Sequence, residues 1–458
     1  MLKRVNDISL TLNGERVMVG AEPGERLSES LRERLGARDV KIGCNAGDCG
    51  ACTVLVDGAP VCACLMTTQQ AAGCAVETAA GLSRGDPHAR ALAERFQDHG
   101  AAQCGFCTPG MVVAAVALLR ENDAPDEAQI EGALAGVLCR CTGYRAIVDA
   151  VAAVPGSLAG AGAVGDSIRR LDGADKLTGA ERFGDDIAPP GTLTIRVIRS
   201  PHARAAFEFG DLERWRAGRS GIEAVLTADD IPGENRFGVI PQFADQPVFA
   251  QSIARFRGEA IAAVVGEPQA IDDLAPADFP VTWTPLDAVA EPAPAREPGA
   301  PLLHDDRADN VMCEGFVRCG DAKAALARAD VVATGAFATA FVEHAYLEPE
   351  AGFAEVVDGR VEIHVCTQAP VMDLESMALI LGRDKRDVRI VPSGCGGGFG
   401  SKLDLSIQPY LALGALKTGR PVRLALTRTE SMQSTTKRHP ASIALTIGAT
   451  KDGKICGF

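Results

Sequence analysis

The sequence predicts a multidomain α+β protein, and three observations carry this prediction. Ten of the fifteen cysteines lie before residue 142, where eight of them form two tight groups. Hydrophobic periodicity changes along the chain from alternation to helical spacing and then to a mixture of both. Stretches rich in Pro, Gly and Ala interrupt the chain twice, and 458 residues exceed one ordinary domain. We therefore expect domains over residues 1–77, 78–155, 176–295 and 302–458, with a linker over residues 156–175.

Composition excludes several classes of protein. Apolar residues at 47% and charged residues at 23% are typical of globular chains. A net charge of −14 argues against a nucleic-acid partner. The longest apolar run, Met111 to Leu119, is far shorter than the ~20 residues of a membrane span. No secretory signal is visible at the N-terminus, so the cysteines indicate metal ligation in a reducing compartment. We expect a cytoplasmic location.

Residues 1–77 read as a small β-grasp, ferredoxin-like unit. Two alternating stretches, residues 8–12 and 15–19, flank Asn13-Gly14, which is a strong two-residue hairpin signal. A helical segment over residues 27–35 and a strand over residues 53–56 follow, with a cysteine-rich loop between them.

That loop has the spacing of a plant-type [2Fe–2S] site. Three cysteines in C-x4-C-x2-C order and one later cysteine supply the four thiolates. Glycines let such a backbone wrap closely around a cluster. Structural zinc is the alternative, but it usually takes two Cys-x-x-Cys pairs. The predicted ligands are Cys44, Cys49, Cys52 and Cys64, whereas Cys62 and Cys74 fall outside the spacing.

Residues 78–155 predict an all-helical bundle, with helical periodicity over residues 111–121, 127–138 and 145–153. Its cysteines form a Cys-x-x-Cys pair and a Cys-x-Cys pair, which alone could hold zinc. Their position directly after a ferredoxin-like unit favours a second [2Fe–2S] cluster, and two clusters in tandem indicate a relay of single electrons. The predicted ligands are Cys104, Cys107, Cys139 and Cys141.

From about residue 166 the chain reads as mixed α/β. Strand-like runs occupy residues 193–197 and 260–265, and another at 387–392 leads into a glycine-rich loop, Gly394 to Lys402. This loop fits neither a P-loop nor a dinucleotide-binding fingerprint. It does permit close approach of its backbone to a flat, polar ligand.

At these residues the chain resembles the molybdenum hydroxylases of the xanthine oxidase and aldehyde oxidoreductase type. The resemblance covers nearly the whole chain, and the cysteine motifs are its most specific part. The matching segments are Cys44–Thr53, Gln103–Gly110, Cys139–Tyr144, Asp175–Gly179, Arg199–Ala203, Phe256–Ala260, Glu343–Pro349, Thr367–Gln368, Gly396–Gly400 and Arg438–Pro440.

The resemblance implies molybdenum held by a molybdopterin, possibly as the cytosine dinucleotide, beside the helical [2Fe–2S] cluster. Residues 176–295 would be an α/β domain of the xanthine oxidase and aldehyde oxidase type, and residues 302–458 the first half of the molybdopterin-binding part. Gln368 is expected near the oxo ligand of the metal. The cofactor contacts it implies are Gln103, Cys141, Gln368, Gly397, Gly398, Phe399 and Gly400.

Two departures from the family pattern refine this expectation. Xanthine-oxidising members place a glutamate four residues after the loop phenylalanine, but this chain has Leu403, which cannot read the polar edge of a purine. The catalytic glutamate of the family lies beyond the last residue here, and no flavin domain separates the helical unit from residue 166. Either the chain is a fragment of a longer protein, or a second molybdopterin-domain subunit carries this glutamate. We also expect a flavin (FAD) subunit or another electron acceptor.

The predicted function is that of an iron–sulfur and molybdopterin subunit of a split molybdenum hydroxylase. It would oxidise an N-heteroaromatic or aldehyde substrate with water-derived oxygen and pass electrons through both clusters. Two alternatives stay open: a reductase of the same architecture acting on an aromatic thioester, and an electron-transfer or scaffold subunit without molybdenum chemistry.

Overall fold

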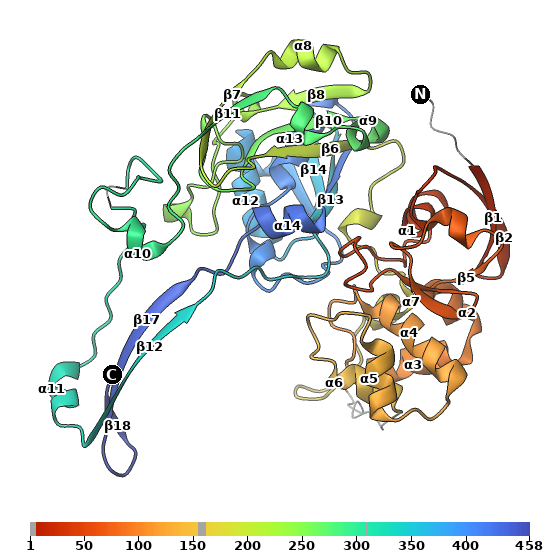
Figure 1. Cartoon of the computed structure of the whole chain (residues 1–458), viewed down its shortest axis with the longest axis horizontal. Coiled ribbons are helices and arrows are strands. Elements are labelled where there is room, and N and C mark those ends of the chain that lie inside the picture. The colour runs from red at the N-terminus through yellow and green to blue at the C-terminus, as the bar shows by residue number, and fades with distance from the viewer. Residues whose placement is uncertain (1–5, 154–161, 308) are drawn as a thin grey trace.

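The computed structural model describes residues 6–153, 162–307 and 309–458. Figure 1 shows an N-terminal part, red to yellow, a larger body, green to blue, and a two-stranded ribbon that projects from that body. Helices and mixed sheets in separate bodies confirm the predicted multidomain α+β fold. Residues 156–161 of the predicted linker over residues 156–175 lie outside the described residues.

The first body is a five-stranded sheet in the order β2-β1-β5-β3-β4. The predicted hairpin is confirmed: β1 pairs antiparallel with β2, and Asn13 and Gly14 take positive φ at the turn. The predicted helix is only partly α-helical, because α1 widens into a π-helix, η1, closed by a bond from Leu35 N to Ser30 O. The elements are β1 (Asn6–Leu12), β2 (Glu15–Ala21), α1 (Leu27–Glu29), η1 (Ser30–Arg34), β3 (Thr53–Val56), β4 (Ala59–Cys62) and β5 (Ala75–Glu77).

The second body is helical, as predicted. Its central helix, α4, buries nearly all its residues from Thr108 to Val116. Helix α5 ends at Leu134, earlier than the periodicity predicts, because the chain turns at Gly136 so that Leu138 N donates to Cys49 O in the first body. The helices are α2 (Ala79–Gly85), α3 (Pro87–Asp98), α4 (Thr108–Glu121), α5 (Glu127–Leu134), α6 (Arg145–Val151) and α7 (Gly173–Thr178).

A seven-stranded mixed sheet forms the core of the larger body, in the order β15-β14-β13-β16-β6-β10-β8. It joins strands from both sides of residue 300, because β16 pairs in parallel with β6. Helices α12 and α13 pack on it through one apolar core. The strands are β6 (Leu193–Arg199), β8 (Ile222–Leu226), β10 (Ala260–Gly266), β13 (Ala351–Val357), β14 (Arg360–Val365), β15 (Val388–Pro392) and β16 (Val422–Ala425).

Smaller elements complete this body. A three-stranded sheet, β11-β7-β9, packs beside α8 around Trp215 and Phe279. The strands are β7 (Ala205–Phe209), β9 (Ile253–Ala254) and β11 (Val281–Pro285). The helices are α8 (Leu212–Ala217), α9 (Pro268–Asp272), α10 (Pro292–Ala295), α12 (Pro370–Leu381), α13 (Gln408–Thr418) and α14 (Arg428–Ser434).

The projecting ribbon pairs β12 (Val331–Thr339) with β17 (Ala441–Ala449) over nine residues, and β18 (Ile455–Gly457) and α11 (Ala322–Ala327) lie at its far end (Figure 1). Most of its side chains are exposed, including the apolar Val331, Phe337 and Ile443. Within the ranges the structure describes, no helix has the length and apolar character of a transmembrane span.

Candidate functional site

The first cysteine loop lies between η1 and β3 and gathers its thiols under a buried backbone. Cys49, Cys52 and Cys64 are buried, and Cys44 is partly exposed. Two backbone N–H groups, those of Ala46 and Cys49, donate to the Cys44 sulfur at 3.3 and 3.4 Å. Burial opposes ionisation of the Cys44 thiol, but these donors hold the pKa of Cys44 below its usual value. N–H groups aimed at a sulfur suit an anionic, cluster-ligating thiolate.

The three thiols of this loop and that of Cys64, which follows β4, associate as two pairs. The Cys52 thiol donates to Cys64 and lowers the pKa of Cys64 to about 6, while Cys44 and Cys49 face each other. The predicted bystanders, Cys62 and Cys74, bond weakly to backbone oxygens, and Cys74 also bonds to the Asp57 side chain.

The second set of cysteines lies on loops at the ends of the bundle helices. Cys107 is the N-cap of α4, and Cys104 lies three residues before it. Cys104 faces Cys141, and Cys107 faces Cys139, whose pKa falls far below its usual value. The Thr142 hydroxyl lies 3.1 Å from the Cys139 sulfur.

Each set brings together the four thiols that the sequence predicts as ligands of one [2Fe–2S] cluster. In a [2Fe–2S] centre two cysteines bind each iron, whereas zinc needs four donors around one point. In the first set Cys44 faces Cys49 and Cys52 faces Cys64, whereas in the second set Cys139 interacts with both Cys107 and Cys141.

The glycine-rich loop follows β15 and meets Gln368, which precedes α12. The Gln368 Oε1 accepts a hydrogen bond from Gly400 N at 3.1 Å, and Gln368 N donates to Lys402 O. A Cβ on Gly398 would lie 2.1 Å from Gln368 Oε1, so any larger residue there would displace the Gln368 amide or the loop. Since Oε1 is occupied, the amide turns its Nε2 donor away from the loop, where it bonds to none of the described residues. Phe399 at the loop tip is about half exposed.

A buried ion pair supports the glycine-rich loop. Lys402 Nζ donates to Glu348 Oε2 at 2.9 Å, and both side chains are 2% exposed. The same carboxylate accepts from the backbone N–H groups of Gly396 and Gly184. Glu348 is therefore fully engaged as a support of the loop and cannot serve as a catalytic base. Glu343 likewise accepts a bond from the backbone N–H of Ala345.

The helical cysteine loop touches the glycine-rich loop directly. The ring of Phe106, between Cys104 and Cys107, would lie 2.8 Å from a Cβ on Gly396. Arg140, between Cys139 and Cys141, donates to His344 O at 3.1 Å. Gln103 is exposed and Cys141 partly exposed at the same end of the bundle. The structure thus brings the predicted second cluster to the predicted cofactor loop.

A cavity of about 510 Å³ opens beside this region. Two segments quoted for the family resemblance line it, Phe256–Ala260 and the histidine of Arg438–Pro440, although they are about 180 residues apart in sequence. Its polar lining includes Tyr410 and Lys437. A cavity of this volume has the size expected for a cofactor or substrate.

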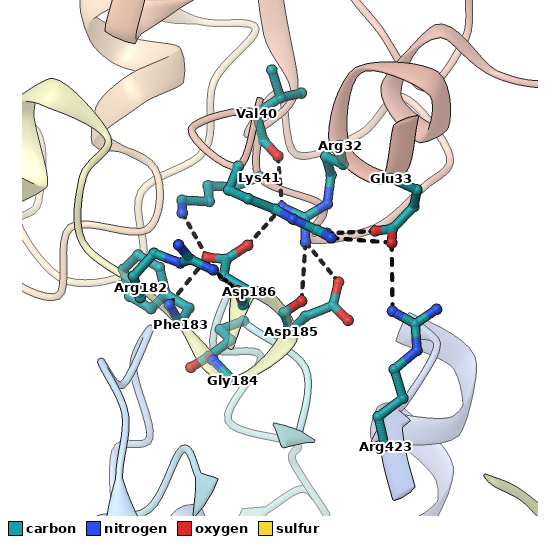
Figure 2. Close-up of polar contacts among 12 residues, drawn as sticks. Arg32, Glu33, Val40, Lys41, Arg182, Phe183, Gly184, Asp185, Asp186 and Arg423 are labelled. Atoms are coloured by element: carbon teal, nitrogen blue, oxygen red, sulfur yellow. Dashed lines mark hydrogen bonds and ion pairs between the residues drawn. The ribbon is translucent and has the colours of Figure 1, made fainter. Parts of the chain in front are cut away.

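A buried ionic network, not foreseen from the sequence, joins the first body to the larger one (Figure 2). Lys41 Nζ lies 2.7 Å from Asp186 Oδ2, with both side chains 1% exposed. Arg32 pairs with Asp185 at 2.8 Å and with Asp186 at 2.9 Å. Burial opposes ionisation of Asp186, but Arg32 and Lys41 hold its pKa below the usual value. Only the tertiary fold brings these residues together.

Four family models match the chain in series. They are the 2Fe-2S iron-sulfur cluster binding domain over residues 10–77, the [2Fe-2S] binding domain over 78–152, the aldehyde oxidase and xanthine dehydrogenase a/b hammerhead domain over 178–287, and the molybdopterin cofactor-binding domain over 303–458. The nicotinate dehydrogenase small FeS subunit of Eubacterium barkeri is 46% identical over 144 residues, which are 91% of that subunit. The chain belongs to the xanthine dehydrogenase and aldehyde oxidoreductase family of molybdenum hydroxylases.

Other members of the family match more of the chain. The large molybdopterin subunit of the same nicotinate dehydrogenase is 34% identical over 62% of this chain and 66% of that subunit. The aldehyde oxidoreductase of Megalodesulfovibrio gigas is 29% identical over 97% of this chain and 52% of the relative. The solved aldehyde oxidoreductase from Desulfovibrio gigas superposes with a TM-score of 0.91, at 29% identity, over 98% of this chain and 52% of that one. The chain thus spans about half the length of this relative.

Family membership confirms the predicted set of cofactors, two [2Fe–2S] clusters and a molybdopterin. The residues assigned to each cofactor stay predictions, and the geometry above is consistent with them. Sequence reasoning missed the supporting role of Lys402, although that residue ended the glycine motif.

Proposed function

We propose that this chain carries the two [2Fe–2S] clusters and the first part of the molybdopterin site of a molybdenum hydroxylase. The substrate is an N-heteroaromatic compound or an aldehyde, and water supplies the oxygen. Electrons leave through the helical cluster, then through the ferredoxin-like cluster, to an FAD subunit or another acceptor.

The contact between Phe106 and Gly396 carries this proposal. It joins the loop of one predicted cluster to the loop predicted to line the molybdopterin, with no intervening layer of protein. Further contacts bind the first cysteine loop to the same region: Arg428 Nε donates to Gly43 O at 3.0 Å, and its Nη2 donates to Leu347 O at 2.7 Å. Three redox sites held on adjacent, rigid loops suit stepwise electron transfer.

The residues of this chain bind the cofactor and orient the side chains around it. Molybdenum bound by the pterin supplies the two-electron redox chemistry. The backbone of Gly397, Gly398 and Gly400 leaves room for the pterin to approach, and Gly397 and Gly400 take φ of +95° and +97°. Gly400 fixes the Gln368 amide so that its Nε2 can donate toward the cofactor. Gln103 and Cys141 would contact the pterin from the helical side.

The general base is proposed to come from further polypeptide, as a separate subunit or a continuing chain. Glu348 and Glu343 are engaged by the backbone in this chain. The exposed apolar strands β12 and β17 support a partner that packs on the ribbon, because an isolated two-stranded ribbon is marginal in water. A permanent interface of this kind buries more than ~2,000 Å².

The names of relatives support the substrate class. They include an aldehyde oxidoreductase and a nicotinate dehydrogenase, the latter divided into a small FeS subunit and a large molybdopterin subunit. Leu403 is about one-third exposed and offers no polar group, which argues against a purine at that position.

The test compares hydroxylation by the 458-residue chain alone and by its assembly with the partner. We expect incorporation of ¹⁸O from labelled water into an aldehyde or N-heteroaromatic product only in the assembly, because a missing general base lowers the rate by roughly 10²–10⁴-fold. Gln368→Ala should lower the rate of the assembly, whereas Arg386→Ala, on an exposed 3-10 turn, should not. Full turnover by the isolated chain would contradict the proposed division of the site.

Metal analysis distinguishes the two alternatives. An assembly with iron but no molybdenum would indicate an electron-transfer or scaffold subunit. An assembly with molybdenum that consumes reductant and an aromatic thioester, without hydroxylating any substrate, would indicate the reductase.

A further inference from the structure

Two arginines without a carboxylate partner lie against the first cysteine loop. Arg428 Nε donates to Gly43 O at 3.0 Å, and Arg26 Nη1 donates to Asn45 O. Gly43 and Asn45 are the residues directly before and after Cys44, a predicted ligand of the first cluster. Among the residues that the structure describes, neither guanidinium lies within 4 Å of an Asp or Glu oxygen.

Arg428 joins the two bodies and still has one nitrogen to spare. Its Nη2 donates to Leu347 O of the larger body at 2.7 Å, while its Nε binds Gly43 O of the first body. Its Nη1 is buried and donates to none of the described residues. Arg428 and Cys44 line the same cavity, of about 170 Å³. A buried cationic donor without a partner is costly, and an anionic cluster bound at Cys44 would compensate its charge.

The other charged side chains on the wall of this cavity are paired with one another or with a neighbour. The pairs are Lys41 with Asp186, Arg32 with Asp185 and Asp186, and Glu348 with Lys402. Asp48, on the cysteine loop itself, is exposed to solvent, where its charge is screened. The uncompensated charge that faces Cys44 from this wall is therefore that of Arg428.

Arg26 reaches the loop from the start of α1. The backbone beside it is tied to the segment that carries another predicted ligand, because Ser28 N donates to Ala63 O, directly before Cys64. The Cys52 thiol is the main cause of the low pKa of Cys64, and the charge of Arg26 contributes to it. The positive charge of Arg26 therefore acts on the first set of thiols.

Such cations change the redox equilibrium of a cluster. A [2Fe–2S] cluster becomes one unit more negative on reduction, because it gains one electron while its four thiolates stay bound. A nearby cation stabilises the reduced state more than the oxidised state, and the stabilisation grows as the pair is shielded from water. Net charge and hydrogen bonding are among the properties that set the potentials of these clusters.

We propose that Arg26 and Arg428 raise the reduction potential of the first cluster and so draw electrons to it from the helical cluster. In this transfer the helical cluster loses one electron, the first cluster gains it, and no bond forms or breaks. The inference rests on the proposed function in one respect, the assignment of Cys44, Cys49, Cys52 and Cys64 as ligands. It is independent of the substrate and of hydroxylation.

A redox titration of the iron-loaded protein, followed by electron paramagnetic resonance, tests this role. Arg26→Met and Arg428→Met should each lower the equilibrium constant for reduction of the first cluster roughly five- to ten-fold, which is about 40–60 mV for one electron. The helical cluster of the same sample is the internal reference and should change less than about two-fold. Arg386→Met, on an exposed 3-10 turn, should shift neither cluster.

Lysine variants separate charge from shape. Arg26→Lys and Arg428→Lys keep the positive charge but lose the planar fork of the guanidinium. We expect each to recover at least half of the loss seen in its methionine variant. Equal shifts in the lysine and methionine variants would show that lost hydrogen bonds cause the effect, and would overturn the inference. Unchanged potentials in both methionine variants, or an equal shift of both clusters, would overturn it as well.

Iron content and the two signals distinguish failure of this inference from failure of the proposed function. Each variant should keep about four irons per chain and both signals. Two normal signals without a shift contradict the role of the arginines alone. Loss of the first cluster from both methionine variants would make the arginines supports of the loop and would also overturn the inference. Absence of the first signal from the unaltered protein contradicts the proposed function, and this inference with it.

Discussion

Asp404 and Asp373 show, at the scale of single residues, how burial changes the titration of a carboxyl group. Burial raises the pKa of Asp404 to about 6, and burial together with Asp404 raises the pKa of Asp373 to about 6, from an ordinary value of 3.8. A raised carboxyl pKa means that the folded state binds its proton more tightly than the unfolded state. Each aspartate therefore stabilises the fold below about pH 4, and this contribution is lost as the pH rises to about 6.

Asp404→Asn should consequently stabilise the folded protein at neutral pH. We expect a gain of about 1–2 kcal/mol at pH 7, shrinking toward zero near pH 4, because asparagine carries no charge to desolvate. Urea denaturation across this pH range measures it. A variant less stable than the unaltered protein at pH 7 would show that the carboxylate is not strained by burial.

Gly398 carries the second residue-scale prediction. In Gly398→Ala the new Cβ would lie 2.1 Å from Gln368 Oε1, so either the amide or the loop must move. We expect molybdenum content to fall several-fold while iron content is unchanged, as measured by elemental analysis. Gly132→Ala is the control, because that glycine lies in α5 with open space around it. Normal molybdenum in Gly398→Ala would mean that the loop is an ordinary turn.

At the scale of elements, the sequence predicted those helices and turns that depend on neighbouring residues alone. The Asn13-Gly14 hairpin and the buried helix α4 follow from turn chemistry and periodicity. The early end of α5 does not, because the backbone N–H of Leu138 donates to Cys49 O on another body instead of continuing the helix. The cysteine ligands were predictable from spacing, but their pairing depends on how two separate loops meet.

The cysteine loops give an element-scale prediction. Cys139→Ser should alter only the electron paramagnetic resonance signal of the cluster near the glycine-rich loop, since Cys139 interacts with Cys107 and Cys141 on the helical loops. The signal of the cluster assigned to Cys44, Cys49, Cys52 and Cys64 should persist. Loss of that second signal instead would contradict the assignment of ligands.

At the scale of the whole molecule, buried polar contacts fix how the iron–sulfur body sits on the larger body. Lys41, Arg32 and Asp186 come from segments about 150 residues apart, so no sequence window reveals them. The pairing of β6 with β16 across the predicted domain boundary is likewise not visible in any sequence window. The sequence could predict which cofactors the chain binds, because their ligands lie in local motifs, but not the surfaces that align them.

Lys41→Met tests this alignment. It leaves the buried Asp186 with one cation instead of two, and we expect a loss of about 3 kcal/mol in the free energy of unfolding. Lys385→Met is the control, because the Lys385–Glu375 pair is exposed and should contribute less than ~1 kcal/mol. Urea denaturation compares the two. Equal losses would mean that the buried network does not hold the bodies together.

The most direct test of the whole account is the electron paramagnetic resonance spectrum of the dithionite-reduced protein, recorded with its iron content. Two cysteine sets in different surroundings, one on a β-sheet loop and one between helices, predict two distinct [2Fe–2S] signals and about four irons per chain. A single signal with about two irons, or zinc in place of iron at either set, would contradict it.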